Sequence, residues 1–350
     1  MSNLTSTSLT VGCDLSDKFS VLCLLHADDR VERHRLRTSK PALEKYFGAL
    51  GQPAHVVIEV GPHSRWVEQL LSQLGHRVTV ANPRRLKVIS TSDSKDDWRD
   101  AELLARLGRA DLSLLAPVKH RSEEAHADLV VLRSRDALVK ARTRLVNFVR
   151  SVVKTSGDRL PKCSAEAFHR RTRLLIPAAL KPALDPMYVA LEALASQIRE
   201  LDRTVERIGA NDPDVAVVAQ IDGVGTLTAL ALMRTVGDKH RFRRSRTVAA
   251  FLGLRPRRSQ SGDDDPQLRI TKAGDGFVRC LLVSAANYIL GPFGKDTDLR
   301  RWGLRLAERG GKNARKRAKV AVARKLSVLM HRLWVTGEQY EPLRAAALAA

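Results

Sequence analysis

The sequence has few cysteines and no long apolar run. Its four cysteines are far apart, and no two have the Cys-x-x-Cys spacing of a zinc site. We therefore expect no disulfide framework, no structural zinc ion and a reducing cytosolic compartment. The longest apolar run, Leu281–Phe293, has 13 residues, which is too short to cross a bilayer. The first ten residues also lack the basic start and the apolar core of a signal peptide, so we expect no membrane partner.

Negative charge is scarce relative to positive charge. Lys and Arg number 60 against 38 Asp and Glu, which gives a formal net charge of +22. Residues 231–350 hold 26 basic and 10 acidic side chains, whereas residues 1–230 hold 34 and 28. An excess of this kind in the last third of the chain indicates a polyanionic partner there, and nucleic acid is the main candidate. A basic protein without such a partner is the alternative.

A chain of 350 residues is long enough for roughly two or three domains. We predict an N-terminal domain over 1–117, a helical linker or dimerisation region over 118–210 and a C-terminal domain over 211–345. In the first domain the patterns follow the order β-β-β-α-β-α-β-α, which predicts a mixed sheet with packed helices, α/β in class. The predicted strands are 9–15, 20–26, 30–37, 55–60 and 77–82, and the predicted helices are 41–50, 64–74 and 93–108.

Two long helices are predicted in the middle of the chain. Residues 122–153 have a helical pattern without Pro or Gly, and a second helix is predicted over 187–208, after a stretch with three prolines. Two such helices would form an extended pair that could serve in dimerisation, and an ordinary helical linker fits the pattern equally well. The C-terminal domain is predicted to be mostly helical, with one helix over 277–290.

Two carboxylates lie within or directly after apolar strand patterns. Asp14 follows the strand pattern 9–13, and Glu59 lies within the apolar run 56–60. Because burying an unpaired charge costs several kcal/mol or more, each carboxylate is a candidate metal ligand. A strand-end acid paired with a basic side chain is the alternative for both.

Asp97 and Asp100 add a helical element to this pattern. They are three residues apart on a predicted helix, so they share one face of it. Acidic residues in a first turn also oppose the helix dipole, which is the alternative explanation. A strand Asp, a strand Glu and a helical Asp-x-x-Asp in this order match ribonuclease-H-like folds of the Holliday-junction resolvase type. Carboxylates that converge in this way hold Mg²⁺ for phosphodiester chemistry.

Two glycines mark a candidate DNA-backbone element in the C-terminal domain. Gly223 and Gly225 separate two predicted helices, as in a helix-hairpin-helix element. Their backbone permits close approach, and the second helix offers its N-terminal N–H groups to a phosphate. A tight turn between packed helices fits the pattern equally well.

A polar loop over 255–266 holds a candidate nucleophile. Ser261 is followed by a glycine and preceded by Arg257 and Arg258, whose charges would neutralise phosphate oxygens. Most Ser-Gly pairs are simple turns, however, and no histidine lies nearby in the sequence to act as a base. Spacing alone therefore leaves the role of Ser261 open.

Motifs from both halves of the chain occur together and in order. They are Val11–Ser16, the strand around Glu59, Lys95–Ala101, Ile221–Ala229, Gly253–Pro256, Gln260–Gly262, Ile270–Asp275 and Ala323–Leu326. With these motifs the sequence resembles the transposases of the insertion-sequence 110 family, which includes bridge-RNA-guided recombinases. The resemblance covers nearly the whole chain.

The resemblance implies a RuvC-like N-terminal domain, a coiled-coil-like middle and a C-terminal transposase domain. It implies a nucleophile, Ser261, that joins DNA through a phosphoserine, and a DEDD set that binds Mg²⁺ or, alternatively, Mn²⁺. The implied partners are donor and target DNA and a structured guide RNA, in the bacterial cytoplasm at the nucleoid. Dimers would assemble into tetramers in which domains of different subunits form one active site. The implied DEDD residues are Asp14, Glu59, Asp97 and Asp100. The predicted nucleic-acid-binding residues are Gly223, Gly225, Arg257, Arg258, Lys272 and Arg279.

Two of these roles have competing neighbours in the sequence. Asp97 is preferred over Asp93 and Asp96 because it keeps the Asp-x-x-Asp step. Ser261 is preferred over Ser259 because a glycine follows it directly. Both choices rest on the match to the family motifs.

Three functions compete for this sequence. The leading one is a DNA transposase or site-specific recombinase that uses metal-binding carboxylates and a serine nucleophile. The second is a resolvase-like nuclease that uses water and forms no covalent intermediate, and the third is a nucleic-acid-binding protein without catalysis. The carboxylate set argues against the third, and the Ser261 loop separates the first from the second. No Walker motif occurs, which agrees with strand exchange that conserves bond energy and needs no ATP.

Overall fold

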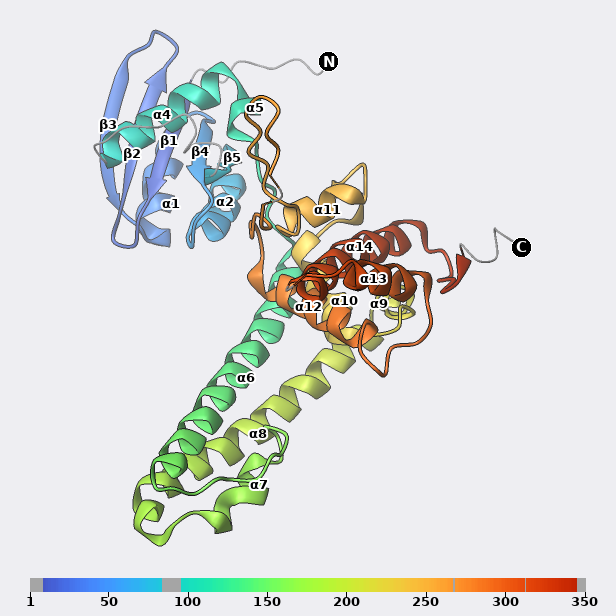
Figure 1. The fold of residues 1–350 in the computed structure, drawn as a ribbon. Coiled ribbons are helices and arrows are strands. Elements are labelled where there is room, and N and C mark those ends of the chain that lie inside the picture. Colours follow the sequence, from blue (N-terminus) through green and yellow to red (C-terminus); the bar gives the residue numbers. More distant parts are fainter. Residues whose placement is uncertain (1–8, 84–95, 267, 312, 345–350) are drawn as a thin grey trace. The chain divides into compact units, whose positions relative to one another are not determined.

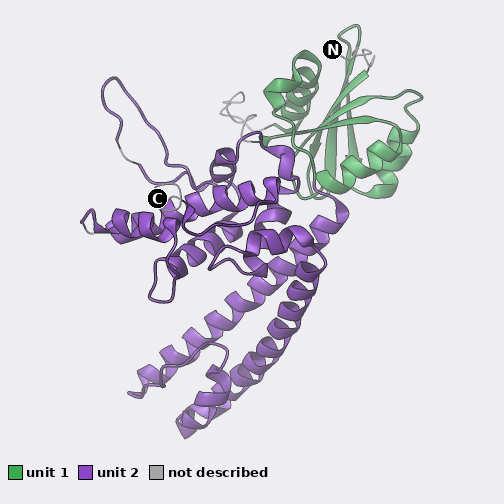
Figure 2. Cartoon of the chain, turned by 90° about the vertical axis from the view of Figure 1, so that its right-hand side faces the viewer, with its two compact units in different colours: residues 1–120 green, residues 121–350 purple. Residues whose placement is uncertain are grey.

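The computed structural model describes residues 9–83, 96–266, 268–311 and 313–344. The chain forms two compact units, residues 1–120 and 121–350 (Figure 2). The first unit holds a five-stranded mixed sheet with helices, and the second is helical (Figure 1). The mixed α/β N-terminal part and the mostly helical remainder predicted from the sequence are both confirmed.

The sheet has the strand order β3-β2-β1-β4-β5. β1 pairs antiparallel with β2, and β2 with β3, whereas β4 is parallel to both β1 and β5. The predicted strand bounds are correct to within one residue, because short apolar runs between turns mark them clearly. The strands are β1 (Leu9–Leu15), β2 (Phe19–His26), β3 (Val31–Arg37), β4 (His55–Glu59) and β5 (Arg77–Ala81). The helices of this unit are α1 (Lys40–Gly48), α2 (Ser64–Gln73), α4 (Asp97–Ala110) and α5 (Leu112–Leu115).

Helices cover both faces of the sheet. Phe47 of α1 and Val67 of α2 share a buried core with Val11 of β1 on one face. On the other face, Ala101 and Ala105 of α4 pack in a separate core. Since side chains alternate along a strand, the even-numbered residues of β1 face α4.

Two long antiparallel helices, α6 (Glu123–Thr155) and α8 (Lys181–Ala210), lie side by side in the second unit (Figures 1 and 2). The prediction of a helical pair is correct, but α8 begins six residues before the predicted start at Met187. Pro182 occupies its first turn, where the missing N–H costs nothing, and Pro186 falls inside the helix. Pro182 and Pro186 therefore lie within this helix and do not mark its boundary.

The remaining helices pack around one large core in the second unit. Leu230, Leu282 and Leu326 are fully buried there, on three different helices. The last two helices, Asp298–Glu308 and Ala314–Thr336, were not predicted from the sequence. The helices are α7 (Phe168–Thr172), α9 (Pro213–Ala219), α10 (Thr226–Val236), α11 (Arg246–Phe251), α12 (Gly276–Ile289), α13 (Asp298–Glu308) and α14 (Ala314–Thr336). Short 3₁₀ helices are η1 (Arg173–Leu175), η2 (Ala178–Leu180) and η3 (Lys239–Arg241).

Within the described residues, no single helix has the length and apolar character needed to cross a membrane. Phe168–Leu175 and Ala178–Ala210 meet that criterion only as a pair, bent by 118° at the break between them.

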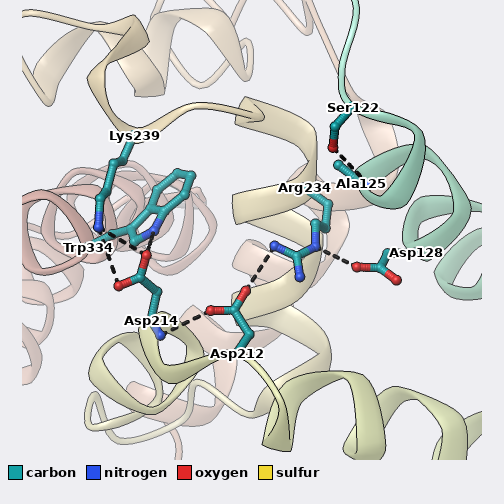
Figure 3. Close-up of polar contacts among 8 residues, drawn as sticks. All are labelled: Ser122, Ala125, Asp128, Asp212, Asp214, Arg234, Lys239 and Trp334. Atoms are coloured by element: carbon teal, nitrogen blue, oxygen red, sulfur yellow. Dashed lines mark hydrogen bonds and ion pairs between the residues drawn. The ribbon is translucent and has the colours of Figure 1, made fainter.

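Arg234 of α10 joins α6 to the turn before α9 (Figure 3). Its Nε donates to Asp128 Oδ2 at 2.6 Å, and its Nη1 lies 2.9 Å from Asp212 Oδ2. The three side chains are 17%, 13% and 18% exposed. Burial lowers the pKa of Arg234, but the hydrogen bond to Asp128 and the charge of Asp212 outweigh burial, so the pKa of Arg234 is raised. The ion pairs hold the start of the long helix against the C-terminal core.

A second acid, Asp214 in the first turn of α9, contacts the last helix. Asp214 Oδ2 accepts from Trp334 Nε1 at 2.8 Å and lies 3.1 Å from Lys239 Nζ (Figure 3). Its backbone N–H donates to Asp212 Oδ1 at 3.0 Å. The turn before α9 thus connects α6, α10 and α14 through polar contacts.

We expect Arg234→Met to lower the free energy of unfolding by about 2–4 kcal/mol, because it leaves two largely buried carboxylates without their partner. Chemical denaturation followed by circular dichroism measures the change. Arg203→Met is the matched control: its ion pair with Glu200 is 77% and 61% exposed, so its loss should cost less than about 0.5 kcal/mol. Equal effects of the two substitutions would contradict this account of the network.

Candidate active site

Asp14 and Glu59 lie on the neighbouring parallel strands β1 and β4, near the carboxyl end of each strand. This end of the sheet is called the carboxylate edge below. Cys13 of β1 is level with Ile58 of β4, so the next residue of each strand is Asp14 and Glu59. Both acids are half-buried. Burial, together with the charge of Asp14, raises the pKa of the Cys13 thiol, which therefore stays neutral.

Helix α4 rests on the backbone of β1 at Gly12. A Cβ at that position would lie 1.9 Å from the carbonyl oxygen of Ala101 and 2.5 Å from the backbone nitrogen of Ala105. Near the end of α4, a Cβ at Gly108 would lie 2.3 Å from Val57 of β4. Two glycines therefore allow the helix to approach the sheet closely. Gly12 and Val57 face α4, and so do Asp14 and Glu59, two residues further along each strand.

The first turn of α4 lies towards the carboxylate edge of the sheet. Later residues of α4 contact the earlier part of β4, since a Cβ at Gly108 would lie 3.6 Å from His55. The helix thus runs opposite to the strands, and its N-terminus is nearest to their carboxyl ends. Asp97 is one turn before Ala101, and Asp100 one turn before the buried Leu104. Both acids extend the face of α4 that packs on the sheet.

Asp96 has a different role from its neighbour. It is the N-cap of α4, and its Oδ1 accepts a hydrogen bond from the backbone N–H of Trp98 at 3.1 Å. Asp93, the third acid considered in the sequence, lies outside the described residues.

The structure brings Asp14, Glu59, Asp97 and Asp100 to one edge of the sheet but not into one coordination shell. Across residues 9–83 and 96–344, apart from 267 and 312, no group of three or more His, Cys, Asp or Glu side chains is arranged to hold a metal ion. The set still fits a hard divalent cation in its chemistry, since every member offers carboxylate oxygens.

Ser261 lies in the second unit, at the tip of an exposed two-stranded ribbon. Its backbone N–H and C=O exchange hydrogen bonds of 3.1 Å with Asp264. Gly262 has a φ of +56°, the conformation that the first central residue of a type II′ turn requires. Arg258 Nε lies 3.3 Å from Asp265 Oδ2, and Arg257 is exposed. Ser261 is thus exposed in a loop that carries both basic and acidic side chains.

The base of the ribbon is held by backbone contacts. A Cβ at Gly253 would lie 2.0 Å from the carbonyl oxygen of Ala273, so only glycine fits there. Arg279 Nη1 donates to the carbonyl oxygens of Ala273 at 2.7 Å and of Leu252 at 2.9 Å. Arg279 therefore braces the ribbon, and its assignment as a nucleic-acid contact stays a prediction. Lys272 is exposed, with a positive φ of 54°.

Gly223 and Gly225 lie in the turn between α9 and α10. Gly223 has a φ of +84°, and a Cβ there would lie 2.8 Å from the ring of Tyr288. Gly225 is exposed and caps α10, with open space around it. The two glycines line a shallow depression of about 430 Å³ together with Ser284 and Tyr288. A turn between two helices is thus present where a helix-hairpin-helix element was predicted, and phosphate binding by it stays a prediction.

One pair of residues beside the carboxylate edge was missed in the sequence. Arg35 of β3 lies over the ring of Phe19 of β2, with its guanidinium carbon 4.3 Å from the ring centroid. The sequence did contain a sign of this surface: Arg33, Arg35 and Arg37 stand at alternate positions, which places three arginines on one face of a strand.

Comparisons with known proteins agree on one family. A model of the DEDD transposases of IS110 elements matches residues 11–156, and a model described as "Transposase IS116/IS110/IS902 family" matches residues 215–294. A transposase for insertion sequence element IS1111A of Coxiella burnetii is 30% identical over 294 residues, covering 81% of this chain and 79% of the relative. The chain belongs to the IS110 family of transposases. It is therefore an enzyme that acts on DNA in transposition or recombination, and its DEDD domain implies the use of a divalent metal ion.

Two further relatives of this transposase extend the comparison. A probable family 20 transposase of Pseudomonas aeruginosa is 28% identical over 342 residues, covering 95% of this chain and 98% of the relative. A pilin gene-inverting protein of Moraxella lacunata is 24% identical over 266 residues, covering 73% and 72% of the two chains.

Proposed function

We propose that this transposase cuts and rejoins DNA strands with two groups of residues: the carboxylates Asp14, Glu59, Asp97 and Asp100, and the nucleophile Ser261. The observation that carries the proposal is the position of the four carboxylates: Asp14 and Glu59 lie near the ends of their strands, and Asp97 and Asp100 lie in the first turn of α4, which begins at the same end of the sheet. An exposed serine at a tight turn, with Arg257 and Arg258 in the same loop, supports the second part.

In the proposed reaction, the Ser261 oxygen attacks the phosphorus of a phosphodiester. The Oγ–P bond forms as the bond to the 3′ oxygen breaks; the hydroxyl proton is lost to solvent, and the leaving oxygen takes one up. Attack by another 3′ hydroxyl on the phosphoserine reverses the step and releases the serine. Because the number of phosphoester bonds is unchanged, no ATP is needed. Mg²⁺ held by the carboxylates would stabilise the charge that develops on the oxygens.

We also propose the wider assembly that the family resemblance implies. A structured guide RNA, donor and target DNA and a homo-oligomer would meet in one complex. The residues proposed to contact nucleic acid are Gly223, Gly225, Arg257, Arg258, Lys272 and Arg279. The net positive charge of residues 231–350 supports a polyanionic partner. The relative named for pilin gene inversion supports site-specific strand exchange over simple hydrolysis. We keep the domain bounds 1–117, 118–210 and 211–345 as part of this proposal.

The choice between two adjacent aspartates tests the metal part of the proposal. Asp97→Ala should reduce metal-dependent cleavage of element-end DNA at least about a hundredfold, because it removes a ligand. Asp96→Ala should keep cleavage within a few-fold and lower the free energy of unfolding by about 1 kcal/mol, because it removes only the helix cap. A gel assay of labelled DNA with the co-purified RNA measures the first effect, and denaturation measures the second. Loss of cleavage in Asp96→Ala alone would assign the ligand to Asp96 instead.

A further inference from the structure

A row of paired residues crosses the sheet beside the carboxylates. Asp14 of β1 is opposite Val21 of β2, and Val21 is opposite Arg35 of β3. Directly opposite residues of antiparallel strands place their side chains on the same face. Val21 packs with Ala101 and Ala105 of α4, so the whole row lies on the α4 face. Arg35 is thus on the same side of the sheet as Asp14, two strands away.

Arg35 is held in place by an aromatic ring. Its guanidinium carbon lies 4.3 Å from the ring centroid of Phe19, which is 37% exposed. Stacking on a ring orients the planar guanidinium and leaves its edge of N–H donors open. An oriented fork of this kind suits a phosphate, which accepts two parallel hydrogen bonds.

Arg35 differs from Arg33, its neighbour on the same face of β3, in whether a carboxylate pairs with it. Arg33 Nη2 donates to Glu102 Oε2 at 3.0 Å, and hydrogen bonds from Arg106 and Arg33 lower the pKa of that carboxyl. In the described parts of the chain, Arg35 has no carboxylate within ion-pair distance. Arg33 therefore shares the carboxylate of Glu102 with Arg106, whereas no carboxylate of the described residues offsets the charge of Arg35.

The spacing suits a nucleic-acid strand. Neighbouring strands of a sheet are about 4.8 Å apart, so the Cα atoms of Arg35 and Asp14 are about 10 Å apart. A strand of stacked nucleotides rises about 3.4 Å per nucleotide, so phosphates bound at these two positions would be about two or three nucleotides apart.

We infer that Arg35, oriented by Phe19, binds a backbone phosphate of the nucleic-acid strand whose reacting phosphate lies at the carboxylate edge. The inference rests on the proposed function, because that function makes the edge the reacting centre. Arg35 sets the register of the strand by holding a phosphate about two or three nucleotides from the one that reacts. DNA and RNA present the same phosphodiester group, so the binding experiment below decides whether the bound strand is DNA or RNA.

The test compares Arg35→Gln with Arg33→Gln in the full-length protein. Fluorescence anisotropy with labelled DNA and RNA strands of one sequence, between 50 and 300 mM KCl with a chelator, avoids any need for cleavage. For Arg35→Gln we expect a three- to tenfold rise in Kd at 150 mM KCl and a log–log salt slope shallower by about 0.7–0.9, as for one lost phosphate contact. Arg33→Gln should change Kd by less than about twofold, because its charge is already paired.

Two conservative variants guard against a folding defect. Arg35→Lys should keep the salt slope, because the charge remains, and lose part of the affinity with the stacked fork. Phe19→Leu should also keep the salt slope and lose part of the affinity, because it leaves the charge of Arg35 but removes the ring that orients it. Equal slopes for wild type, Arg35→Gln and Arg33→Gln with both strands would overturn the inference. A loss confined to DNA or to RNA supports it and identifies the strand.

Failure of the proposed function gives a different result. If Asp97→Ala and Asp14→Asn cut DNA as wild type does, the carboxylates are not the reacting centre, whatever the binding data show. If those variants are inactive while Arg35→Gln binds normally, the proposed chemistry holds and the Arg35 contact is wrong.

Discussion

Ser261→Ala should abolish the covalent protein–DNA adduct and reduce recombination at least about a thousandfold, the scale expected when a nucleophile is removed. The hydroxyl is the only group lost, and it lies exposed in a turn whose backbone hydrogen bonds do not involve the side chain. The fold should therefore be unchanged. The measurement is a denaturing gel of labelled element-end DNA with Mg²⁺ and co-purified RNA, in which the adduct migrates as a labelled protein band.

Ser259→Ala is the matched control for this experiment. Ser259 lies two residues earlier in the same exposed loop and should keep the adduct. Cleavage without any adduct, kept in Ser261→Ala and lost in Asp97→Ala, would refute the serine nucleophile. That result would leave a hydrolytic, resolvase-like nuclease.

Asp14→Asn should reduce metal-dependent cleavage about a thousandfold, equivalent to about 4 kcal/mol of transition-state stabilisation. Asparagine has the shape of aspartate but not its charge, so the half-buried site keeps its packing and loses affinity for the cation. Single-turnover cleavage over a range of Mg²⁺ concentrations separates weaker metal binding from slower chemistry.

Asp17→Asn provides a control only three residues away. Asp17 lies in the turn between β1 and β2, is 94% exposed and pairs with His63 at 3.1 Å. We expect cleavage within about twofold of wild type. If both substitutions slowed cleavage equally, general electrostatics of this edge would explain the effect and Asp14 would lose its special role.

The strands were predictable because their sequence signals are local. β1 and β4 are short apolar runs between turns, and each carboxylate stands out against that background. The edge strand β3 also shows its partial exposure in its alternating pattern. The convergence of Asp14 and Glu59 follows from the parallel pairing of β1 with β4, which the sequence could suggest only through the family motif.

The errors arise where tertiary contacts decide. Prolines in the first turns of α8 suggested a loop, yet a proline there loses little hydrogen bonding. The hydrogen bonds of Arg279 to carbonyl oxygens that chain reversal brings close could not be predicted either, and its contact with nucleic acid stays a prediction. The cap formed by Asp96 and the stacking of Arg35 on Phe19 also depend on atoms that the sequence does not place.

The outer strand β3 has a further consequence for how the protein behaves in a crowded solution. Among the described residues no strand pairs with the outer edge of β3, so its backbone N–H and C=O groups could pair with a strand of another molecule. Arginines at 33, 35 and 37 place positive charge along that edge, so a second copy of the strand would meet its own charge in register. Like charges directly opposite each other oppose such pairing. The arginine that would hold a phosphate, Arg35, therefore also helps to protect the sheet from aggregation by edge-to-edge addition.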